Sequence, residues 1–460
     1  MSGLPDLAAD ALAAVLGDRL STSMADREHH GHGESYHPTS PPDAVCYPLA
    51  TAEVQSIVAV CREHRLPIVP FGAGTSLEGH VAALHGGIAL DLSRMNRILE
   101  VNASDMDATV EPGVTRLQLD AYLRDTGLFF AVDPGAEATL GGMAATRASG
   151  TNAVRYGTMR DAVLGLEVVL ADGRVVETGG RARKSAAGYD LTRLFVGSEG
   201  TLGIITRLTL RLFGRPEAVA VATCAFPDVE AAVRTAMEVV QTGIPIARVE
   251  LLDKNSMIAV NRFSKLGYPE KPTLFFEFQG SAAGVEEQTL ATAAIAEGHR
   301  GSAFGWARGP EERRRLWQAR HAFHYATLAM RPGAKIWGTD VCVPIGSLAT
   351  CIARAHQDAA RAPFFVTILG HVGDGNFHMG YLIDPDDPLE LTQAQALNDR
   401  LVGHALSLGG TCTGEHGIGY GKARFLELEH GAVAVAVMRE IKMALDPLGI
   451  MNPGKVLPPT

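Results

Sequence analysis

LPIVPFGAGTS, residues 66–76, is an apolar run that passes directly into a glycine turn. The apolar run predicts a short buried strand. Gly72 and Gly74 have no Cβ, so a ligand can approach the backbone closely, and successive N–H groups of such a turn can cradle a phosphate. No Gly-Lys-Ser/Thr follows, which excludes a Walker loop, and no GxGxxG opens a helix, which excludes the Rossmann fingerprint. Taken alone, the turn is equally consistent with an ordinary loop.

Three further loops rich in small residues follow this turn. They are DPGAEATLGG at 133–142, SGTNAVRYG at 149–157 and GSEGTLGI at 197–204. Together with the first loop they resemble the FAD-binding domain of the vanillyl-alcohol oxidase superfamily, over about residues 40 to 215. The resemblance implies that the first loop holds the pyrophosphate, the second and third line the flavin, and the fourth lies along the adenosine half.

The resemblance also names the expected contacts of FAD one by one. They are Pro70, Gly72, Ala73, Gly74, Thr75, Ser76, Pro134, Thr139, Gly141, Gly142, Ser149, Gly150, Tyr156, Gly157, Glu199, Gly203, Ile204 and Asn452. Members of the superfamily that bind flavin covalently carry a histidine in the first loop, where this chain has Thr75. We therefore expect noncovalent FAD.

The alternation of elements favours an α+β fold of several parts. Short strands and helices in the first half follow no regular βαβ repeat, and the glycine motifs stop near residue 215. We expect an N-terminal helix and an extended, exposed segment over 1–39 and an FAD-binding domain over 40–215. A substrate and metal-binding cap domain follows over 216–409, with an antiparallel sheet covered by helices on one face. Residues 410–460 are expected to return to the FAD-binding domain.

Composition restricts the class of protein. Of the 460 residues, 46% are hydrophobic and 20% are charged, which is typical of a folded globular chain. The net charge of -10 argues against a nucleic-acid surface. Six scattered cysteines without CxxC spacing favour a reducing cytoplasm, and no apolar run reaches the roughly 20 residues that span a bilayer. We expect a cytoplasmic protein, with peripheral membrane contact left open.

A second motif carries two histidines. GHVGDGNFH, residues 370–378, lies between apolar runs, and its Asp-Gly turn predicts a β-hairpin. In one straight strand His371 and His378 would point to opposite faces, whereas the reversal lets both imidazoles converge. Glu415, in TGEHGIG, offers a carboxylate. Two imidazoles and one carboxylate leave coordination positions open, as in a catalytic metal site, and buried core histidines are the alternative.

These motifs resemble one branch of the same superfamily, which comprises D-lactate dehydrogenases, glycolate oxidase subunits and D-2-hydroxyglutarate dehydrogenases. The stretches LWQARH at 316–321 and RPGAK at 331–335 look most like the cytochrome-type D-lactate dehydrogenases. The resemblance implies that a divalent metal, zinc or manganese, binds His371, His378 and Glu415. It further implies that Arg320 clamps the substrate carboxylate, that His416 is the catalytic base, and that His324 also contacts substrate.

The expected activity is FAD-dependent oxidation of a small D-2-hydroxy acid to the 2-oxo acid, by metal-assisted hydride transfer to the flavin. Glycolate oxidase-type and D-2-hydroxyglutarate dehydrogenase activities are alternatives. A metal-dependent hydrolase is an alternative from another class, although it has no need of the flavin loops. The expected partners are the substrate and an electron acceptor such as cytochrome c, a quinone or an electron-transfer flavoprotein, with a homodimer left open.

A D-lactate-like monocarboxylate is expected rather than a dicarboxylate. A second carboxylate in a partly dry pocket needs its own cation, and the only candidate near Asp340 is Lys335. Gly338 and Thr339 stand where dicarboxylate enzymes are expected to carry a lysine, and Gly380 offers no donor. The apolar residues Ile336, Trp337 and Met379 are expected to accept a methyl or short alkyl tail.

Overall fold

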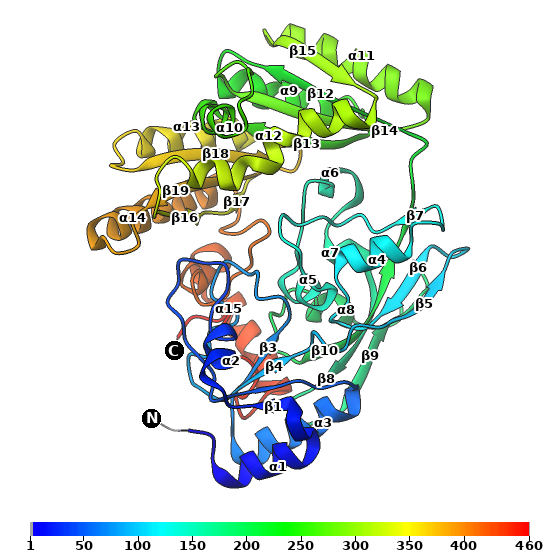
Figure 1. Ribbon diagram of the computed structural model, residues 1–460, viewed down its shortest axis with the longest axis vertical. Coiled ribbons are helices and arrows are strands. Elements are labelled where there is room, and N and C mark those ends of the chain that lie inside the picture. The colour runs from blue at the N-terminus through cyan, green and yellow to red at the C-terminus, as the bar shows by residue number, and fades with distance from the viewer. Residues whose placement is uncertain (1–2, 460) are drawn as a thin grey trace. The chain divides into compact units, whose positions relative to one another are not determined.

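The computed structural model describes residues 3–459, which form two compact units. The first unit comprises Met1–Gly150, Gly157–Arg215 and Glu415–Thr460, and the second comprises Thr151–Tyr156 and Pro216–Gly414 (Figure 1). The mixture of helices with separate sheets confirms the predicted α+β class. The short segment Thr151–Tyr156 belongs to the second unit although the sequence analysis placed it inside the FAD-binding domain.

The first unit contains two main sheets. A four-stranded sheet has the order β1-β2-β4-β3, and a five-stranded antiparallel sheet has the order β5-β6-β10-β8-β9. The strands are β1 (Leu20–Ser21), β2 (Ala44–Cys46), β3 (Ile68–Phe71), β4 (Ile88–Asp91), β5 (Ile98–Asn102), β6 (Asp107–Val110), β8 (Val163–Val169), β9 (Val175–Gly179) and β10 (Ile204–Arg211), with a small ribbon of β7 (Leu128–Phe129) and β11 (Phe213–Gly214). β2, β4 and β3 are parallel, so the carboxyl ends of these three strands lie at one edge.

Helices complete the first unit. They are α1 (Asp6–Leu16), η1 (Gly17–Arg19), α2 (Met24–His29), α3 (Thr51–His64), α4 (Arg116–Tyr122), α5 (Leu140–Thr146), α7 (Met159–Ala162), α8 (Leu191–Phe195), η3 (Ala423–Phe425) and α15 (Leu426–Leu445), which is broken at Gly431. α1 and α3 bury Leu12 and Ile57 against Ile68 and Ile88 of the parallel strands. The return of the chain end is visible in a bridge between Ile68 and Met451.

Residues 26–42 form a polar tract that overlaps the segment expected to be extended and exposed, but part of this tract is helical and part is buried. Part of it lies in α2, and His30 is only 2% exposed. The Nε2 atom of His30 lies 2.8 Å from Asp91 Oδ2, and its ring packs 4.3 Å from the ring of Phe71 at the end of β3. The exposure expected for this tract was wrong for His30, because a carboxylate at the end of a neighbouring strand satisfies its buried imidazole.

The second unit is built on one large antiparallel sheet of order β15-β12-β14-β13-β18-β19-β16, with β17 paired to β19. The strands are β12 (Ala218–Ala225), β13 (Ile246–Leu252), β14 (Thr273–Gly280), β15 (Ser302–Ala307), β16 (Lys335–Gly338), β17 (Val341–Cys342), β18 (Phe365–His371) and β19 (Asn376–Ile383). The helices are α6 (Ala153–Tyr156), α9 (Val229–Gln241), α10 (Lys254–Ser264), α11 (Ala282–Gly298), α12 (Pro310–Leu328), η2 (Ile345–Ser347), α13 (Leu348–Ala359) and α14 (Pro388–Ser407).

Helices cover both faces of this sheet, not one face as expected. Val221 of β12 packs in a cluster with Trp317 of α12, whereas Cys224, three residues later and on the opposite face, lines a hollow with Ala293 of α11. The strands explain this arrangement. β14 is buried along Thr273–Gln279 without a break, and a strand without alternating exposed positions is covered on both sides.

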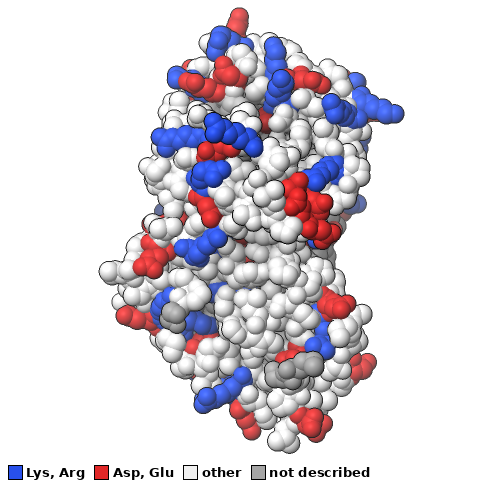
Figure 2. All heavy atoms as spheres, turned by 90° about the vertical axis from the view of Figure 1, so that its left-hand side faces the viewer, with Lys and Arg blue, Asp and Glu red and all other residues white. Residues whose placement is uncertain are grey.

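On the face drawn in Figure 2, basic and acidic side chains are interspersed, in keeping with the modest net charge of -10. Among residues 3–459, none of the helices combines the length and the apolar character that crossing a membrane requires.

The hairpin turn between β18 and β19 generates a stability prediction. Gly375 has φ +80°, and a Cβ there would lie 2.0 Å from the carbonyl oxygen of Val343. We expect Gly375→Ala to destabilise the protein by about 2 kcal/mol or more, because it adds left-handed strain to a backbone collision. Gly346→Ala is the control, since nothing lies within 4 Å of its added Cβ. Equal melting temperatures of the two variants would contradict the prediction.

Candidate functional site

The first and second glycine loops of the first unit meet directly. Gly72 follows β3, and a Cβ on it would lie 2.4 Å from Thr139 Oγ1. Thr139 caps α5, because its hydroxyl accepts a hydrogen bond of 3.3 Å from the Gly142 amide. Gly141 in turn lies against Pro112, where a Cβ would come within 2.5 Å of the proline ring. The loops can approach this closely only because glycine occupies both positions.

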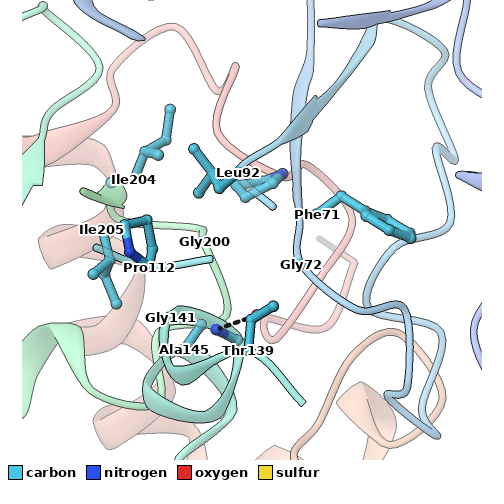
Figure 3. A pocket seen from close by; sticks show the side chains of 13 residues that line it. Phe71, Gly72, Leu92, Pro112, Thr139, Gly141, Ala145, Gly200, Ile204 and Ile205 are labelled. Atoms are coloured by element: carbon cyan, nitrogen blue, oxygen red, sulfur yellow. Dashed lines mark hydrogen bonds between the residues drawn. The ribbon is translucent and has the colours of Figure 1, made fainter. Parts of the chain in front are cut away.

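A hollow of about 440 Å³, part of it open to solvent, lies between these loops and the ends of β3 and β10 (Figure 3). Its walls are mostly apolar or backbone. The lining residues are Pro70, Phe71, Gly72, Leu92, Pro112, Thr139, Gly141, Gly142, Ala145, Gly200, Gly203, Ile204 and Ile205. Such a concave apolar site with exposed backbone suits a large planar cofactor.

The hollow brings together part of the predicted FAD set. Seven predicted residues line it, namely Pro70, Gly72, Thr139, Gly141, Gly142, Gly203 and Ile204. The remaining predicted residues, among them Pro134, Ser149, Gly150 and Gly157, do not line it and stay predictions. The sequence analysis missed Leu92 and Pro112, which follow strands but lie outside the glycine loops. The position of Leu92, directly after the strand that pairs with β3, is the signal that could have identified it.

Ser76 tests whether the first loop suits a phosphate-bearing cofactor. Its Oγ is buried and has no hydrogen-bond partner within residues 3–459. Buried hydroxyl groups are normally satisfied, so this atom is suited to donate to a ligand oxygen. Together with the close backbone approach at Gly72, this fits the predicted contact with FAD.

Glu199 has a role that the sequence analysis did not foresee. Its carboxylate accepts hydrogen bonds from the amides of Ile418 (2.7 Å) and Gly419 (2.8 Å), and it lies 3.2 Å from His80 Nε2. Burial alone raises the pKa of Glu199, but His80 and the two amides outweigh it and hold this pKa below its ordinary value. Asn452 donates to the backbone oxygen of Glu199 at 2.8 Å, so both predicted FAD residues also fasten the C-terminal segment.

The third glycine loop is divided between the units. Gly150 and Gly157 belong to the first unit, whereas Tyr156 belongs to the second. There its hydroxyl donates a hydrogen bond of 2.6 Å to Gln279 Oε1, and the neighbouring Arg155 donates to the backbone oxygen of Gln279 at 2.9 Å. Tyr156 as an FAD contact therefore stays a prediction.

The predicted base, His416, lies in the first unit beside a buried carboxylate. Its Nδ1 is 4.0 Å from Glu78 Oε1, which lies 3.3 Å from Lys422 Nζ. Burial raises the pKa of Glu78, but Lys422 and the nearby His37 and His416 together hold it below its ordinary value. The sequence analysis missed Glu78 because it stopped at Ser76, two residues earlier in the same loop.

In the second unit the predicted hairpin places both histidines on one sheet face. β18 and β19 pair with His371 opposite Asn376 and Leu369 opposite His378. His371 and Leu369 share a face because side chains alternate, and His378 shares the face of its partner Leu369. The two imidazole rings lie 5.3 Å apart, centroid to centroid. The reversal predicted from the Asp-Gly turn is therefore present.

Hydrogen bonds fix the tautomer of both rings. His371 Nδ1 lies 2.6 Å from Glu250 Oε1, and His378 Nδ1 lies 3.0 Å from the backbone oxygen of Thr339. A carboxylate and a carbonyl can only accept, so each Nδ1 carries the proton. In this tautomer each ring has its lone pair on Nε2, which is the atom that can bind a metal. The donor set thus fits a divalent ion.

Arg320 of α12 joins the same network. Its Nε donates a hydrogen bond of 2.9 Å to Glu250 Oε2, and its side chain is 17% exposed. His324 lies one helical turn later and is exposed, so its substrate contact stays a prediction. Glu415 and His416 belong to the first unit, at the point where the chain leaves the second. Their grouping with His371 and His378 likewise stays a prediction.

Two of the expected apolar substrate neighbours lie on the wrong face. Trp337 pairs with Tyr381 of β19, and Met379 is two residues before Tyr381. Both therefore point to the face opposite His378, which corrects the expectation that they accept an alkyl tail. Ile336 lies on the His378 face, because it pairs with Leu382. Local sequence distance to His378 was misleading because side chains of a strand alternate.

Comparison with known proteins identifies the family. A model of the FAD binding domain matches residues 42–179, and a model of the C-terminal domain of FAD linked oxidases matches residues 215–456. The "Probable D-lactate dehydrogenase, mitochondrial" of Danio rerio is 53% identical over 448 residues, covering 96% of this chain and 90% of that protein. The "D-lactate dehydrogenase [cytochrome], mitochondrial" of Arabidopsis thaliana is 47% identical, covering 97% of this chain and 79% of that protein.

A solved structure supports the fold. The structure of p-cresol methylhydroxylase with substrate bound superposes with a TM-score of 0.79 at 18% identity, covering 98% of this chain and 96% of that one. At this identity the likeness shows the fold alone, which is the vanillyl-alcohol oxidase type expected from the glycine loops. With the family models matching both parts of the chain, this protein belongs to the FAD-linked oxidase family and is an FAD-dependent oxidoreductase.

Proposed function

We propose that the protein oxidises a short D-2-hydroxy acid of the D-lactate type to the corresponding 2-oxo acid. The observation that carries this proposal is the single carboxylate of Glu250, which holds Arg320 and His371 side by side. An anion-binding group and a metal-ligand histidine in one network suit a substrate with adjacent carboxylate and hydroxyl groups. Relatives named D-lactate dehydrogenases support the same substrate class.

We further propose that a divalent ion, zinc or manganese, binds Nε2 of His371, Nε2 of His378 and the carboxylate of Glu415. The tautomers described above support the two imidazole ligands. Glu415 follows Gly414 directly, and the preceding Thr413 donates a hydrogen bond of 2.6 Å to Asp340, beside His378. Chain continuity therefore supports the carboxylate as third ligand. Zinc and manganese both accept this donor set.

The chain's own residues have separate roles in this reaction. Arg320 binds and orients the substrate carboxylate by a charge-assisted hydrogen bond. His416 accepts the hydroxyl proton as a general base, and the anionic Glu78, 4.0 Å from its Nδ1, stabilises the imidazolium that results. A metal ion held by His371, His378 and Glu415 would supply Lewis acidity toward the substrate hydroxyl group. FAD held by the glycine loops of the first unit would supply a two-electron acceptor.

The cofactor and the acceptor complete the proposal. We propose noncovalent FAD, because the half-buried Thr75 stands where covalent members carry histidine. His80 lies later in the same loop, but its Nε2 is 3.2 Å from Glu199. We propose a cytochrome, such as cytochrome c, as the electron acceptor, because the Arabidopsis relative is named a D-lactate dehydrogenase [cytochrome]. The six cysteines are widely scattered and have no CxxC spacing, which supports a reducing compartment such as the cytoplasm.

The substrate assignment is tested by comparing kcat/KM for D-lactate, L-lactate, D-2-hydroxybutyrate, glycolate and D-2-hydroxyglutarate. Lys335 pairs with Ile383, five residues along β19 from His378, which is about 16 Å at the rise of a strand. Lys335 is therefore too distant to neutralise a second carboxylate of the substrate. We expect kcat/KM for D-lactate to exceed kcat/KM for D-2-hydroxyglutarate by about 100-fold or more. A preference for the dicarboxylate would refute the assignment.

Removal of the metal should abolish activity without releasing FAD, because the two are proposed to bind different residues. After dialysis against a chelator we expect turnover to be lost while the flavin absorbance stays with the protein, because the proposed metal ligands are not among the FAD contacts. Zinc or manganese should restore turnover. Acid precipitation of the same sample should release the yellow colour into the supernatant. Full activity after elemental analysis confirms metal removal would refute the metal site, and a coloured pellet would refute noncovalent FAD.

Substitutions of the proposed base, His416, and of the proposed carboxylate-binding residue, Arg320, should have different kinetic effects. We expect His416→Gln to slow flavin reduction by about 100-fold or more with little change in substrate binding. Arg320→Ala should instead weaken substrate binding by about 10- to 100-fold, the loss expected for a charged hydrogen bond. His404→Gln and Arg331→Ala are matched controls, because these residues pair with Asp358 and Glu390, which are not among the proposed site residues. Stopped-flow reduction measures both quantities, and small, equal effects would contradict the roles.

A further inference from the structure

Glu250 is a buried carboxylate that no sequence motif singled out. It lies on β13 directly opposite His371 of β18, and its side chain is 0% exposed. One oxygen, Oε1, lies 2.6 Å from His371 Nδ1, and the other, Oε2, lies 2.9 Å from Arg320 Nε. Its two partners come from different elements, a central strand and helix α12. A single side chain thus joins the two functional groups of the second unit.

We infer that Glu250 is a positioning residue that sets the metal affinity of His371 and the orientation of Arg320 together. The inference deepens the proposed function and rests on it for the identity of the two groups. Glu250 contacts neither the substrate nor the reacting atoms in this assignment. It acts through its neighbours, by fixing the Nδ1–H tautomer of His371 and by holding one edge of the guanidinium, so that the other edge can face the substrate carboxylate.

Packing explains why Arg320 reaches this carboxylate. Phe275 of β14 pairs with Glu250, and its ring stacks on Trp317 of α12 at 6.2 Å. Trp317 precedes Arg320 by three residues, so the two side chains lie on the same side of the helix. The aromatic contact therefore fixes α12 on the sheet at the register that places Arg320 over Glu250. On the same strand face, Arg248 donates to Asn152 at 2.9 Å.

Arg320 and His371 each donate a hydrogen bond to Glu250, so this position requires a side chain with two acceptor oxygens. Glutamine has the same shape but only one acceptor atom, so in Glu250→Gln one of the two donors faces an amide N–H. Aspartate keeps both acceptors but is shorter by one methylene, and it cannot reach both partners at 2.6 and 2.9 Å without movement. The negative charge also matters, because a carboxylate behind a metal-ligand histidine raises the basicity of its Nε2.

Burial and charge agree with a functional role. Burial alone raises the pKa of Glu250, but His371 and Arg320 outweigh it and hold this pKa below its ordinary value. A buried ion pair of this kind adds little to stability compared with apolar packing.

Glu390 is a second carboxylate of the same unit that pairs with an arginine, and it serves as the control residue. It pairs with Arg331 at 2.8 Å, and that arginine is 38% exposed. Glu390→Gln therefore makes the same chemical change without touching the proposed site.

The test uses the holoenzyme with FAD bound and its metal removed. Mn²⁺ is titrated into wild type, Glu250→Gln and Glu390→Gln, and the free ion is measured by its electron paramagnetic resonance signal. We expect Glu250→Gln to bind Mn²⁺ about 10- to 100-fold more weakly than wild type, in the range for loss of an outer-shell partner. Glu390→Gln should bind like wild type. Flavin absorbance and melting temperature report whether each variant is folded.

A second measurement concerns Arg320. KM for D-lactate is compared among wild type, Glu250→Gln, Arg320→Ala and the double variant. If Glu250 acts on the substrate through Arg320, Glu250→Gln should raise KM when Arg320 is present. The same substitution should change KM much less in the Arg320→Ala background. Additive effects would show that Glu250 does not act through the arginine. If Glu250→Gln does not fold, Glu250→Asp takes its place in both measurements with the same expectations.

The outcomes separate this inference from the proposed function. If wild type binds no Mn²⁺, the proposed metal site fails, and the Arg320 comparison alone decides the role of Glu250. If wild type binds Mn²⁺ and Glu250→Gln binds it equally well, the inference is overturned while the metal site stands. An equal loss of Mn²⁺ affinity in Glu390→Gln would also overturn it, because any buried carboxylate would then have the same effect.

Discussion

In the first unit, backbone segments from distant parts of the chain approach one another where a side chain would collide. A Cβ on Gly72 would meet the hydroxyl of Thr139. A Cβ on Gly33 would lie 2.4 Å from the backbone oxygen of Ser76, and a Cβ on Gly419 would lie 1.9 Å from the backbone oxygen of Glu78. The first of these contacts lies in the wall of the hollow, because Gly72 and Thr139 both line it. The cofactor site, the loop of His416 and the N-terminal tract all depend on this close approach.

Buried carboxylates hold the resulting arrangement together. Glu199 joins the fourth glycine loop to residues 418 and 419, and Asp446 accepts from the amides of Ile450 and Met451 where the chain end returns to β3. Glu250 likewise is fully buried and accepts from two donors, but its partners are the side chains proposed to bind metal and substrate rather than loop amides. An unpaired carboxylate in these positions would be costly, so each one requires its partners to be in place.

Strand alternation decides which side chains of the second unit act together. His371, His378 and Glu250 share one sheet face, and α12 places Arg320 on that face. Trp337 and Met379 are near His378 in the chain but point to the other side. The same sheet is covered by helices on both faces, so a change of face moves a residue into a separate hydrophobic layer.

The sequence by itself determined what depends on local order. Glycine at 72 and 141 predicted the cofactor loops, and the Asp-Gly turn predicted the hairpin that brings His371 and His378 together, because turn chemistry and strand period act over a few residues. Only the tertiary structure decided the partners of these residues. Glu250 is 121 positions from His371, and Glu199 is 220 positions from Gly419. The pairing of buried charges across such distances depends on strand register and helix packing, which a reading of local pattern does not contain.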